Sequence, residues 1–200
     1  MIVFVGTAGS SNNQLRTPCD CAFDSHSDTL YIADTMNHRI VQYPKNASLG
    51  TVVAGDNGGG HGITQLNAPK GIYFDSLSNG LYIANTNSHN VVRWLLNASS
   101  WTLVAGNING LSGSTSTELS NPLSVVLDSA GNIYVADRDN HRIQLYLRDN
   151  TNGTTVVGVA GVSGNDSVLL NSPSSVVVDT QFNIYVADSS NFRVQKFSLY

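Results

Sequence analysis

The chain has 200 residues, of which 41% are hydrophobic and 12% are charged, and its formal net charge at pH 7 is −4. This composition is typical of a globular protein. The negative balance gives no general attraction to nucleic acid or to an anionic membrane surface, and no apolar run approaches the roughly 18 residues of a membrane-spanning helix. We therefore expect neither a nucleic-acid partner nor a membrane partner.

The first expected element is an N-terminal strand over residues 2–9, with the sequence IVFVGTAG. After it, a ten-residue phrase such as YIADTMNHRI occurs four times, with intervals of 51, 52 and 51 residues between copies. The four copies begin at Tyr31, Tyr82, Tyr134 and Tyr185. Self-similarity at a fixed period of this size indicates a repeat architecture. We predict a single domain over residues 1–200, with units of about 15–55, 66–106, 119–161 and 170–200 that follow the N-terminal strand.

Each unit is expected to form four strands, as the third unit illustrates. Its β-rich runs are 124–127, 133–136, 142–147 and 155–160, and segments rich in Gly, Asn, Asp and Thr separate them. No helical period is present, so the chain reads as all-β. The first run is apolar on both faces, which requires a sheet that is covered on both sides. Four-stranded sheets packed between similar sheets are the blades of a β-propeller.

The repeated phrase resembles the NHL repeat, a family of β-propeller blades named for an Asn-His-Leu signature. Asn37-His38-Arg39 and Asn140-His141-Arg142 keep the Asn-His pair and have Arg in place of Leu. Asn191-Phe192-Arg193 lacks the His, and Ser88-His89-Asn90 lacks the Asn. The resemblance implies four four-stranded NHL-type blades. It does not select a function, because NHL propellers include RNA-binding modules, protein-interaction modules and an amidating lyase.

The two ends of the chain leave two arrangements open. The segment 2–9 resembles the fourth strand of a unit, whereas the last unit stops after its third strand, near residue 199. Antiparallel pairing of residues 2–5 with residues 193–199 would close a ring of four blades and protect both strand edges. The alternative is a four-blade arc of a larger propeller, since NHL propellers usually have six blades. We expect the arc.

Two positions of the phrase vary together. An Asp stands five residues before an Arg in three units, whereas both positions are Asn in the second unit, at Asn85 and Asn90. Loss of one partner alone would leave a poorly solvated charge, so we predict an Asp–Arg structural clamp across the turn between the second and third strands. The predicted pairs are Asp34–Arg39, Asp137–Arg142 and Asp188–Arg193.

Catalytic and metal-binding signals are weak. His38, His89 and His141 occupy one position of three units, so a propeller would distribute them around its ring, beyond the ligand distance of a shared metal. We expect imidazoles that pack at the blade turn and are hydrogen-bonded to the backbone, and no metal, no cofactor and no catalytic residue. His61 and Asp20 would be the first suspects if a metal bound. The G-x-S-x-G, P-loop and HExxH motifs are absent. Recurrent carboxylates after the first strand read as turn residues, and they are Asp24, Asp75, Asp128 and Asp179.

Cysteines and sequons add little. Cys21 replaces Ile72, Val125 and Val176 in the repeat and is expected to be a small core residue, and a disulfide with Cys19 would be strained. Glycosylation sequons are compatible with an extracellular glycoprotein, although the Asn-rich and Ser-rich composition yields such sequons by chance. They lie at Asn46, Asn97, Asn152 and Asn165.

The sequence therefore favours a non-enzymatic scaffold that binds a protein or glycan through a face of turns and loops. The alternatives are a propeller lyase or hydrolase with a metal at the channel mouth and, third, an RNA-binding NHL module. The candidate contact residues are Thr35, Asn37, His38, Asn87, His89, Arg138, Asn140, His141, Ser190 and Asn191.

Overall fold

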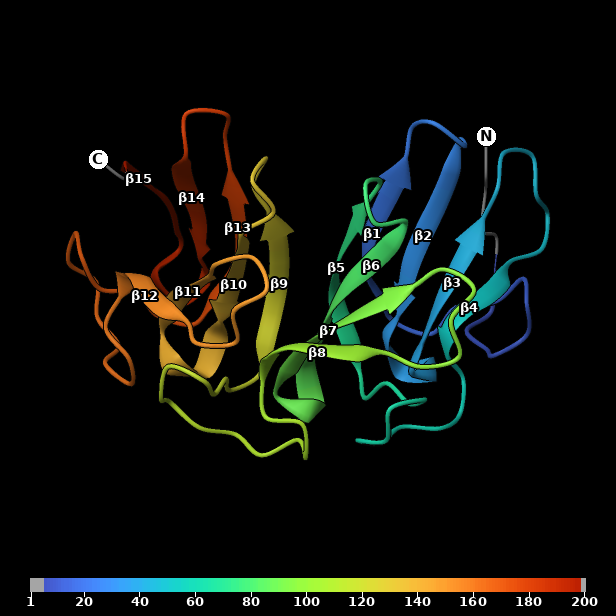
Figure 1. Ribbon diagram of the computed structural model, residues 1–200, viewed down its shortest axis with the longest axis horizontal. Coiled ribbons are helices and arrows are strands. Elements are labelled where there is room, and N and C mark those ends of the chain that lie inside the picture. The colour runs from blue at the N-terminus through green and yellow to red at the C-terminus, as the bar shows by residue number, and fades with distance from the viewer. Residues whose placement is uncertain (1–5, 199–200) are drawn as a thin grey trace.

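The computed structural model of the chain describes residues 6–198, and these residues form an all-β structure (Figure 1). The strands are β1 (Pro18–Asp24), β2 (Thr29–Asp34), β3 (Arg39–Tyr43), β4 (Thr51–Gly55), β5 (Pro69–Asp75), β6 (Gly80–Asn85), β7 (Asn90–Leu95), β8 (Thr102–Gly106), β9 (Pro122–Leu127), β10 (Ile133–Asp137), β11 (Arg142–Tyr146), β12 (Thr154–Gly158), β13 (Pro173–Val178), β14 (Asn183–Asp188) and β15 (Arg193–Ser198). In every sheet, consecutive strands pair antiparallel in the order of the sequence. The predicted propeller blades are confirmed, as β1–β4, β5–β8, β9–β12 and β13–β15, and the last of these has three strands among the described residues.

Short turns join the strands within each blade. The Asp128 carboxylate accepts hydrogen bonds from the backbone N–H groups of Ala130 and Asn132, both at 2.9 Å, and so closes the β9–β10 turn. Asn and Asp side chains commonly stabilise turns by such hydrogen bonds to the backbone that follows them. At the other end of each blade, a single 3₁₀ turn joins the second and third strands. These turns are η1 (Thr35–Asn37), η2 (Thr86–Ser88), η3 (Arg138–Asn140) and η4 (Ser189–Asn191).

Three apolar clusters fill the spaces between adjacent sheets, one for each junction. Their fully buried members include Ile40 and Ile83 at the first junction, Val91 and Val135 at the second, and Ile143 and Ile184 at the third. The strand pattern that was apolar on both faces is thereby explained, because the two inner sheets are covered on both sides. Burial of one aliphatic side chain of this size contributes about 1.5–3 kcal/mol.

In the part of the chain that the structure describes, the first and fourth sheets form the two ends of an open arc (Figure 1). One repeat position faces the next sheet, and its residues Ile40, Val91 and Ile143 are all 0% exposed. The equivalent Val194 on β15 is 73% exposed, because no sheet among the described residues covers it. Residues 6–9 form no strand, and the predicted pairing of residues 2–5 with residues 193–199 lies outside the described residues.

The predicted core role of Cys21 is wrong. Ile72, Val125 and Val176 stand at the same repeat position, face the preceding sheet and are at most 5% exposed. Cys21 and Cys19 are free thiols and exposed, because the first sheet has no preceding sheet among the described residues. The position is therefore a core position only where another blade covers it.

Candidate functional site

We call the turn-and-loop face the surface formed by turns η1–η4 and by the inter-sheet loops 56–68, 107–121 and 159–172. The first two of these loops run along the lower edge of Figure 1, and the β1–β2 and β13–β14 hairpins lie at the upper edge. All ten candidate contact residues belong to the four turns or directly follow them.

All three predicted Asp–Arg pairs are formed at the base of this face. The Nε–Oδ2 distance is 2.8 Å for Arg39–Asp34 and for Arg142–Asp137, and it is 2.7 Å for Arg193–Asp188. In the second unit, the Asn85 amide donates to Asn90 Oδ1 at 3.2 Å. The neutral pair thus takes the place of the charged pair.

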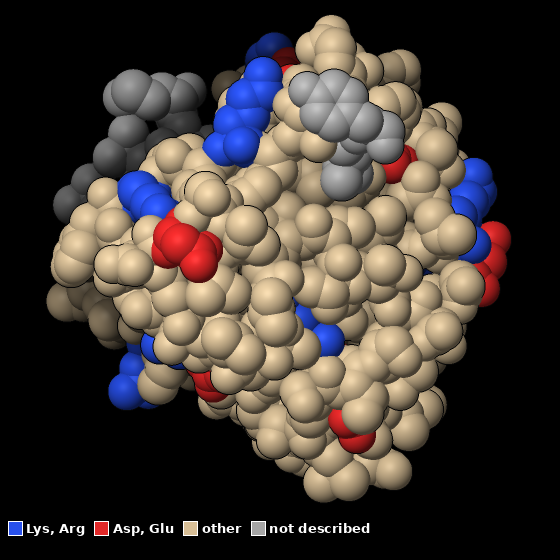
Figure 2. Space-filling view, turned by 90° about the vertical axis from the view of Figure 1, so that its left-hand side faces the viewer, with Lys and Arg blue, Asp and Glu red and all other residues tan. Residues whose placement is uncertain are grey.

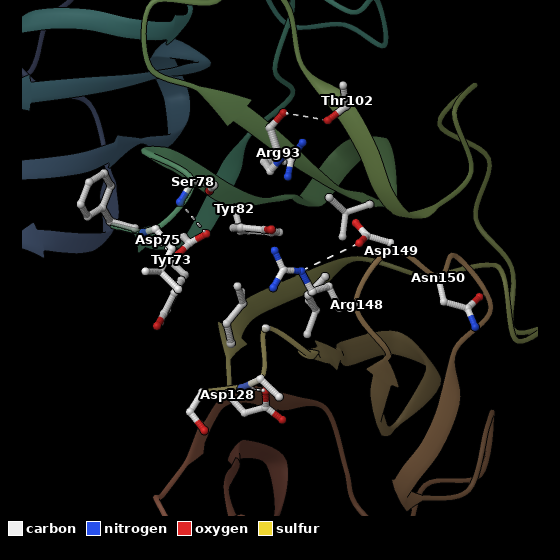
Figure 3. A pocket seen from close by; sticks show the side chains of 18 of the residues that line it. Tyr73, Asp75, Ser78, Tyr82, Arg93, Thr102, Asp128, Arg148, Asp149 and Asn150 are labelled. Carbon is white, nitrogen blue, oxygen red and sulfur yellow. Dashed lines mark hydrogen bonds and ion pairs between the residues drawn. The ribbon is translucent and has the colours of Figure 1, made fainter.

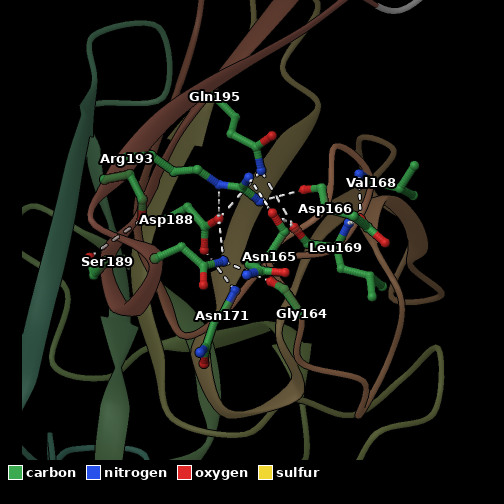
Figure 4. A network of polar contacts seen from close by, with 12 residues as sticks. Gly164, Asn165, Asp166, Val168, Leu169, Asn171, Asp188, Ser189, Arg193 and Gln195 are labelled. Carbon is green, nitrogen blue, oxygen red and sulfur yellow. Dashed lines mark hydrogen bonds and ion pairs between the residues drawn. The ribbon is translucent and has the colours of Figure 1, made fainter.

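Each arginine also anchors the loop that enters its own blade, a contact that the sequence did not predict. Arg142 donates to the backbone carbonyls of Ser114, Thr115 and Glu118, each at 2.9 Å. Figure 4 shows the same arrangement in the fourth unit, where the Arg193 guanidinium donates to loop carbonyls from Asn165 to Leu169. A planar guanidinium with five N–H donors suits such a multiple contact. The arginine is therefore a structural tie between the loop and the turn.

The asparagine of the phrase belongs to this network and not to a free contact surface. Asn140 is buried, and its amide donates to Asp137 Oδ2 and to the carbonyl of Gly113, both at 2.8 Å. Asn37 and Asn191 make the equivalent bonds. The expectation that these asparagines face a partner is corrected, because their donors are used within the blade.

Burial and hydrogen bonding shift the pKa of the clamp carboxylates in opposite directions. Burial raises the pKa of Asp137, although the Ser120 N–H, Asn140 and Arg142 all stabilise its anion. At Asp188 burial also acts upward, but the corresponding bonds from Asn171 N–H and Arg193 outweigh it and lower the pKa. The difference follows from position, because Asp188 lies in the fourth sheet, whose outer face no described sheet covers.

The repeated histidines tie each blade to the next. The Nδ1 atoms of His38, His89 and His141 accept hydrogen bonds from backbone N–H groups of the following unit at 3.0, 3.1 and 3.1 Å. Each histidine therefore carries its proton on Nε2 when neutral. All three adopt the left-handed conformation, with φ between 50° and 56°, which is uncommon for residues other than glycine. A backbone-bonded imidazole was expected, but the inter-blade direction of the bond was not.

Threonine adds a second tie at two of the junctions. The Thr35 hydroxyl donates to the Pro69 carbonyl at 2.7 Å, and the Thr86 hydroxyl donates to the Pro122 carbonyl at 2.8 Å. Thr35 is 3% exposed. Its predicted place on the contact surface is therefore corrected as well.

Three of the ten candidate residues are exposed to solvent, namely Asn87, Arg138 and Ser190. The sequence reasoning missed a set of exposed apolar side chains on the same face. They are Met36, Ile63, Ile108, Leu111, Val162, Val168 and Phe192, with exposed fractions from 46% to 96%. The available signal was the presence of isolated Ile, Leu and Val residues in polar loops, where no strand partner could bury them.

The described residues do not bring together a metal-binding group, since no cluster of three or more His, Cys, Asp or Glu side chains is present among them. His61 Nδ1 lies 2.9 Å from the Ser88 hydroxyl. The Asp20 carboxylate accepts from the backbone N–H groups of Ile72 at 3.0 Å and Cys21 at 2.8 Å. Both residues therefore have structural partners in different parts of the arc.

Charged side chains are sparse on the side of the molecule that carries β12 and β15, and Lys and Arg do not gather there (Figure 2). RNA recognition requires a basic surface with aromatic side chains for base stacking. The visible surface lacks the first of these features. Among the described residues, no helix has the length and apolar character needed to span a membrane.

Comparison with known proteins identifies the repeated unit. A family model described as NHL repeat matches residues 119–146 and 170–197, which are most of the third and fourth blades. These two segments of the chain match NHL repeats. The matched segments contain two of the three Asp–Asn–Arg networks, so these networks are part of the NHL unit in this protein.

Several known proteins are similar to this chain at low identity. The chain is 26% identical to the chloroplastic protein SUPPRESSOR OF QUENCHING 1 of Arabidopsis thaliana, over 98% of this chain and 22% of that protein. A crystal structure of a nidogen/laminin complex matches with a TM-score of 0.71 at 18% identity, over 92% of this chain and 60% of that chain. A gluconolactonase of Xanthomonas campestris matches with a TM-score of 0.70 at 13% identity, over 95% and 60%. The chain thus spans about a fifth of the curated relative and three fifths of these two structures.

Proposed function

We propose that this NHL propeller is a non-enzymatic scaffold that binds a protein partner through its turn-and-loop face. The observation that carries the proposal is the set of exposed apolar side chains on three successive inter-sheet loops. Ile63 is 53%, Leu111 is 61% and Val168 is 59% exposed. A contiguous exposed apolar patch is typical of a protein interaction site, and these side chains are the candidates for such a patch.

The polar groups of the face support a binding role over a catalytic one. Its repeated Asp, Asn, Arg and His side chains are bonded to one another or to backbone groups, as described above. A catalytic acid, base or nucleophile must instead be within reach of a substrate. The low-identity likeness to a gluconolactonase concerns the fold alone.

The test compares substitutions at the two ends of the propeller. Leu111→Asp on the turn-and-loop face is paired with the control Leu77→Asp, in the β5–β6 hairpin at the opposite end, where Leu77 is 90% exposed. Both sites are exposed, so both variants should fold, which circular dichroism would verify. Proteins captured by the immobilised chain would be identified, and the best candidate would be purified and titrated by calorimetry.

We expect a purified partner that binds the wild type and Leu77→Asp equally, with at least tenfold weaker binding to Leu111→Asp. The proposal is wrong if the affinity is the same for all three chains, or if only Leu77→Asp weakens it. Binding of a glycan instead of a protein, sensitive to Leu111→Asp on a glycan array, would replace the protein partner by a carbohydrate.

A further inference from the structure

A crevice of about 600 Å³ opens between the second and third sheets, at the end of the propeller opposite the turn-and-loop face (Figure 3). One wall is the end of β5 with the β5–β6 turn, and it includes Tyr73 and Asp75. The other wall is the β9–β10 turn with the segment 148–151. The volume lies within the range of about 300–1,000 Å³ that is usual for small-molecule sites.

The repeat itself explains why this junction is open. Between the first and second sheets, the Tyr31 and Phe74 rings are stacked with their centroids 5.0 Å apart. The same two repeat positions at the next junction are Tyr82 and Leu127, and both line the crevice. Leucine is smaller than phenylalanine and offers no ring for stacking, so the space is less filled.

The crevice also carries a charge that the neighbouring junctions lack. Arg93 pairs with Tyr82 across the β6–β7 ladder, whereas Gln42 and Leu145 occupy that repeat position in the first and third units. Arg93 is half-buried. Among the described residues, its guanidinium takes part in no ion pair.

A second guanidinium enters from the opposite wall. Figure 3 shows Arg93 and Arg148 directed into the space between the sheets, with the Tyr82 ring beside them. Arg148 is exposed, and its only described ion pair is a 3.9 Å contact with Asp149, which is also exposed. Such a surface pair contributes little and is readily exchanged for another anion.

Two half-buried carboxylates of the crevice, Asp75 and Asp128, form no described ion pair with these arginines. Asp75 accepts from the backbone N–H groups of Leu77 at 3.1 Å and Ser78 at 3.2 Å, and Asp128 closes the β9–β10 turn in the same way. Burial, with Asp75 and Asp128 nearby, raises the pKa of Tyr73, so its hydroxyl remains protonated at neutral pH. The crevice therefore combines two arginine forks with aromatic walls.

We propose that this crevice is a binding site for a small ligand that carries an oxyanion. The carboxylate or phosphate group lies between Arg93 and Arg148, and the remainder of the ligand occupies the space between the two walls. Guanidinium groups bind both kinds of oxyanion in a bidentate manner, so sugar acids and sugar phosphates are suitable probes.

The test uses calorimetric titration of the full chain with three probes, D-glucuronate, glucose 6-phosphate and glucose. We expect binding of at least one anionic probe and none of glucose at the same concentration. Preference for glucuronate or for glucose 6-phosphate then assigns the carboxylate or the phosphate. Absence of binding by both anionic probes at millimolar concentration, or equal binding of glucose, would overturn the proposal.

Variants test the place of binding. Arg93→Gln and Arg148→Gln should each weaken the anionic probe about tenfold or more, which corresponds to about 1.4 kcal/mol. Leu127→Phe, which copies the aromatic residue of the first junction, should abolish binding by filling the crevice. The matched control Arg138→Gln, on the turn-and-loop face, should bind like the wild type. Unchanged affinity in Arg93→Gln would refute the site, and thermal unfolding of each variant verifies that it is folded.

Discussion

Removal of one clamp arginine should destabilise the protein more than removal of the whole clamp. The third unit offers the sharpest case, because Arg142 is 3% and Asp137 is 0% exposed. Arg142→Asn leaves the Asp137 carboxylate buried without its counter-charge and frees three loop carbonyls. The double variant Asp137→Asn/Arg142→Asn instead reproduces the neutral pair that the second unit already contains.

The expected magnitudes follow from burial. Loss of one partner of a buried ion pair costs about 3–5 kcal/mol, since a charge is left without compensation. Coupling between contacting residues is about 0.5–3 kcal/mol, so the double variant should recover part of the loss caused by Arg142→Asn. The same single substitution at Arg193 should cost less, because the Arg193 side chain is 28% exposed and solvent screens its partner.

Urea unfolding at pH 7, followed by circular dichroism and by tryptophan fluorescence, measures these differences. Agreement between the two signals is required before free energies are assigned, because repeat proteins can unfold in parts. The clamp interpretation fails if Arg142→Asn costs less than about 1 kcal/mol. It also fails if the double variant is at least as unstable as the single one.

Three further outcomes are expected. Burial lowers the pKa of His89 below its ordinary value, so the contribution of His89 to stability is complete above about pH 6.5 and is lost as the pH falls toward its folded-state pKa. The stability difference between wild type and His89→Asn should therefore shrink between pH 7.5 and pH 5. A constant difference would contradict this. Val194→Asp should change the free energy of unfolding by less than about 0.5 kcal/mol, whereas Ile143→Asp, at the equivalent but covered position, should abolish folding. If Val194→Asp also abolished folding, the fourth sheet would be covered in solution. Trp101→Phe should lower the free energy of unfolding by about 1–3 kcal/mol, because the Trp101 indole N–H donates to the Gln65 carbonyl at 2.8 Å. Hydrogen exchange of loop 56–68 should also accelerate, and unchanged exchange would show that the indole does not stabilise this loop.

The fold was predictable because four copies of one unit report the same strand pattern. A single copy would have left the turn at Asp128 and the strand that follows it ambiguous, whereas equivalent carboxylates at the same place in every unit fix the hairpin. The state of the end sheets was less predictable. The burial of Cys21 depends on the presence of another blade, which no local pattern encodes, and the assumption that all copies share one environment gave the wrong answer there.

The candidate site was predictable only in its pairing within a blade. The repeat positions of Asp137 and Arg142 are both charged in three units and both Asn in the second unit, and this co-variation revealed the clamp. The contacts from Arg142 to residues 114–118, and from His141 to Ser172, join residues 24–31 positions apart. Backbone groups make one side of these contacts, so no side-chain pattern marks them. The asparagines and histidines therefore looked like contact residues although their polar atoms hold the propeller together.

The second unit shows what the network has to accomplish. It lacks the Asp–Arg pair. In the third unit Arg142 donates to the Glu118 carbonyl, and at the equivalent Gln65 carbonyl of the second unit the Trp101 indole donates instead. Likewise, the Ser88 hydroxyl donates to the carbonyl of Gly60 at 3.2 Å, as the asparagine amide of other units does to an equivalent loop carbonyl. Different side chains thus satisfy the same backbone groups. Because an unsatisfied buried carbonyl costs about 1–3 kcal/mol, the requirement in each blade is a donor for the entering loop, and the charged pair is one of two ways in which this chain provides it.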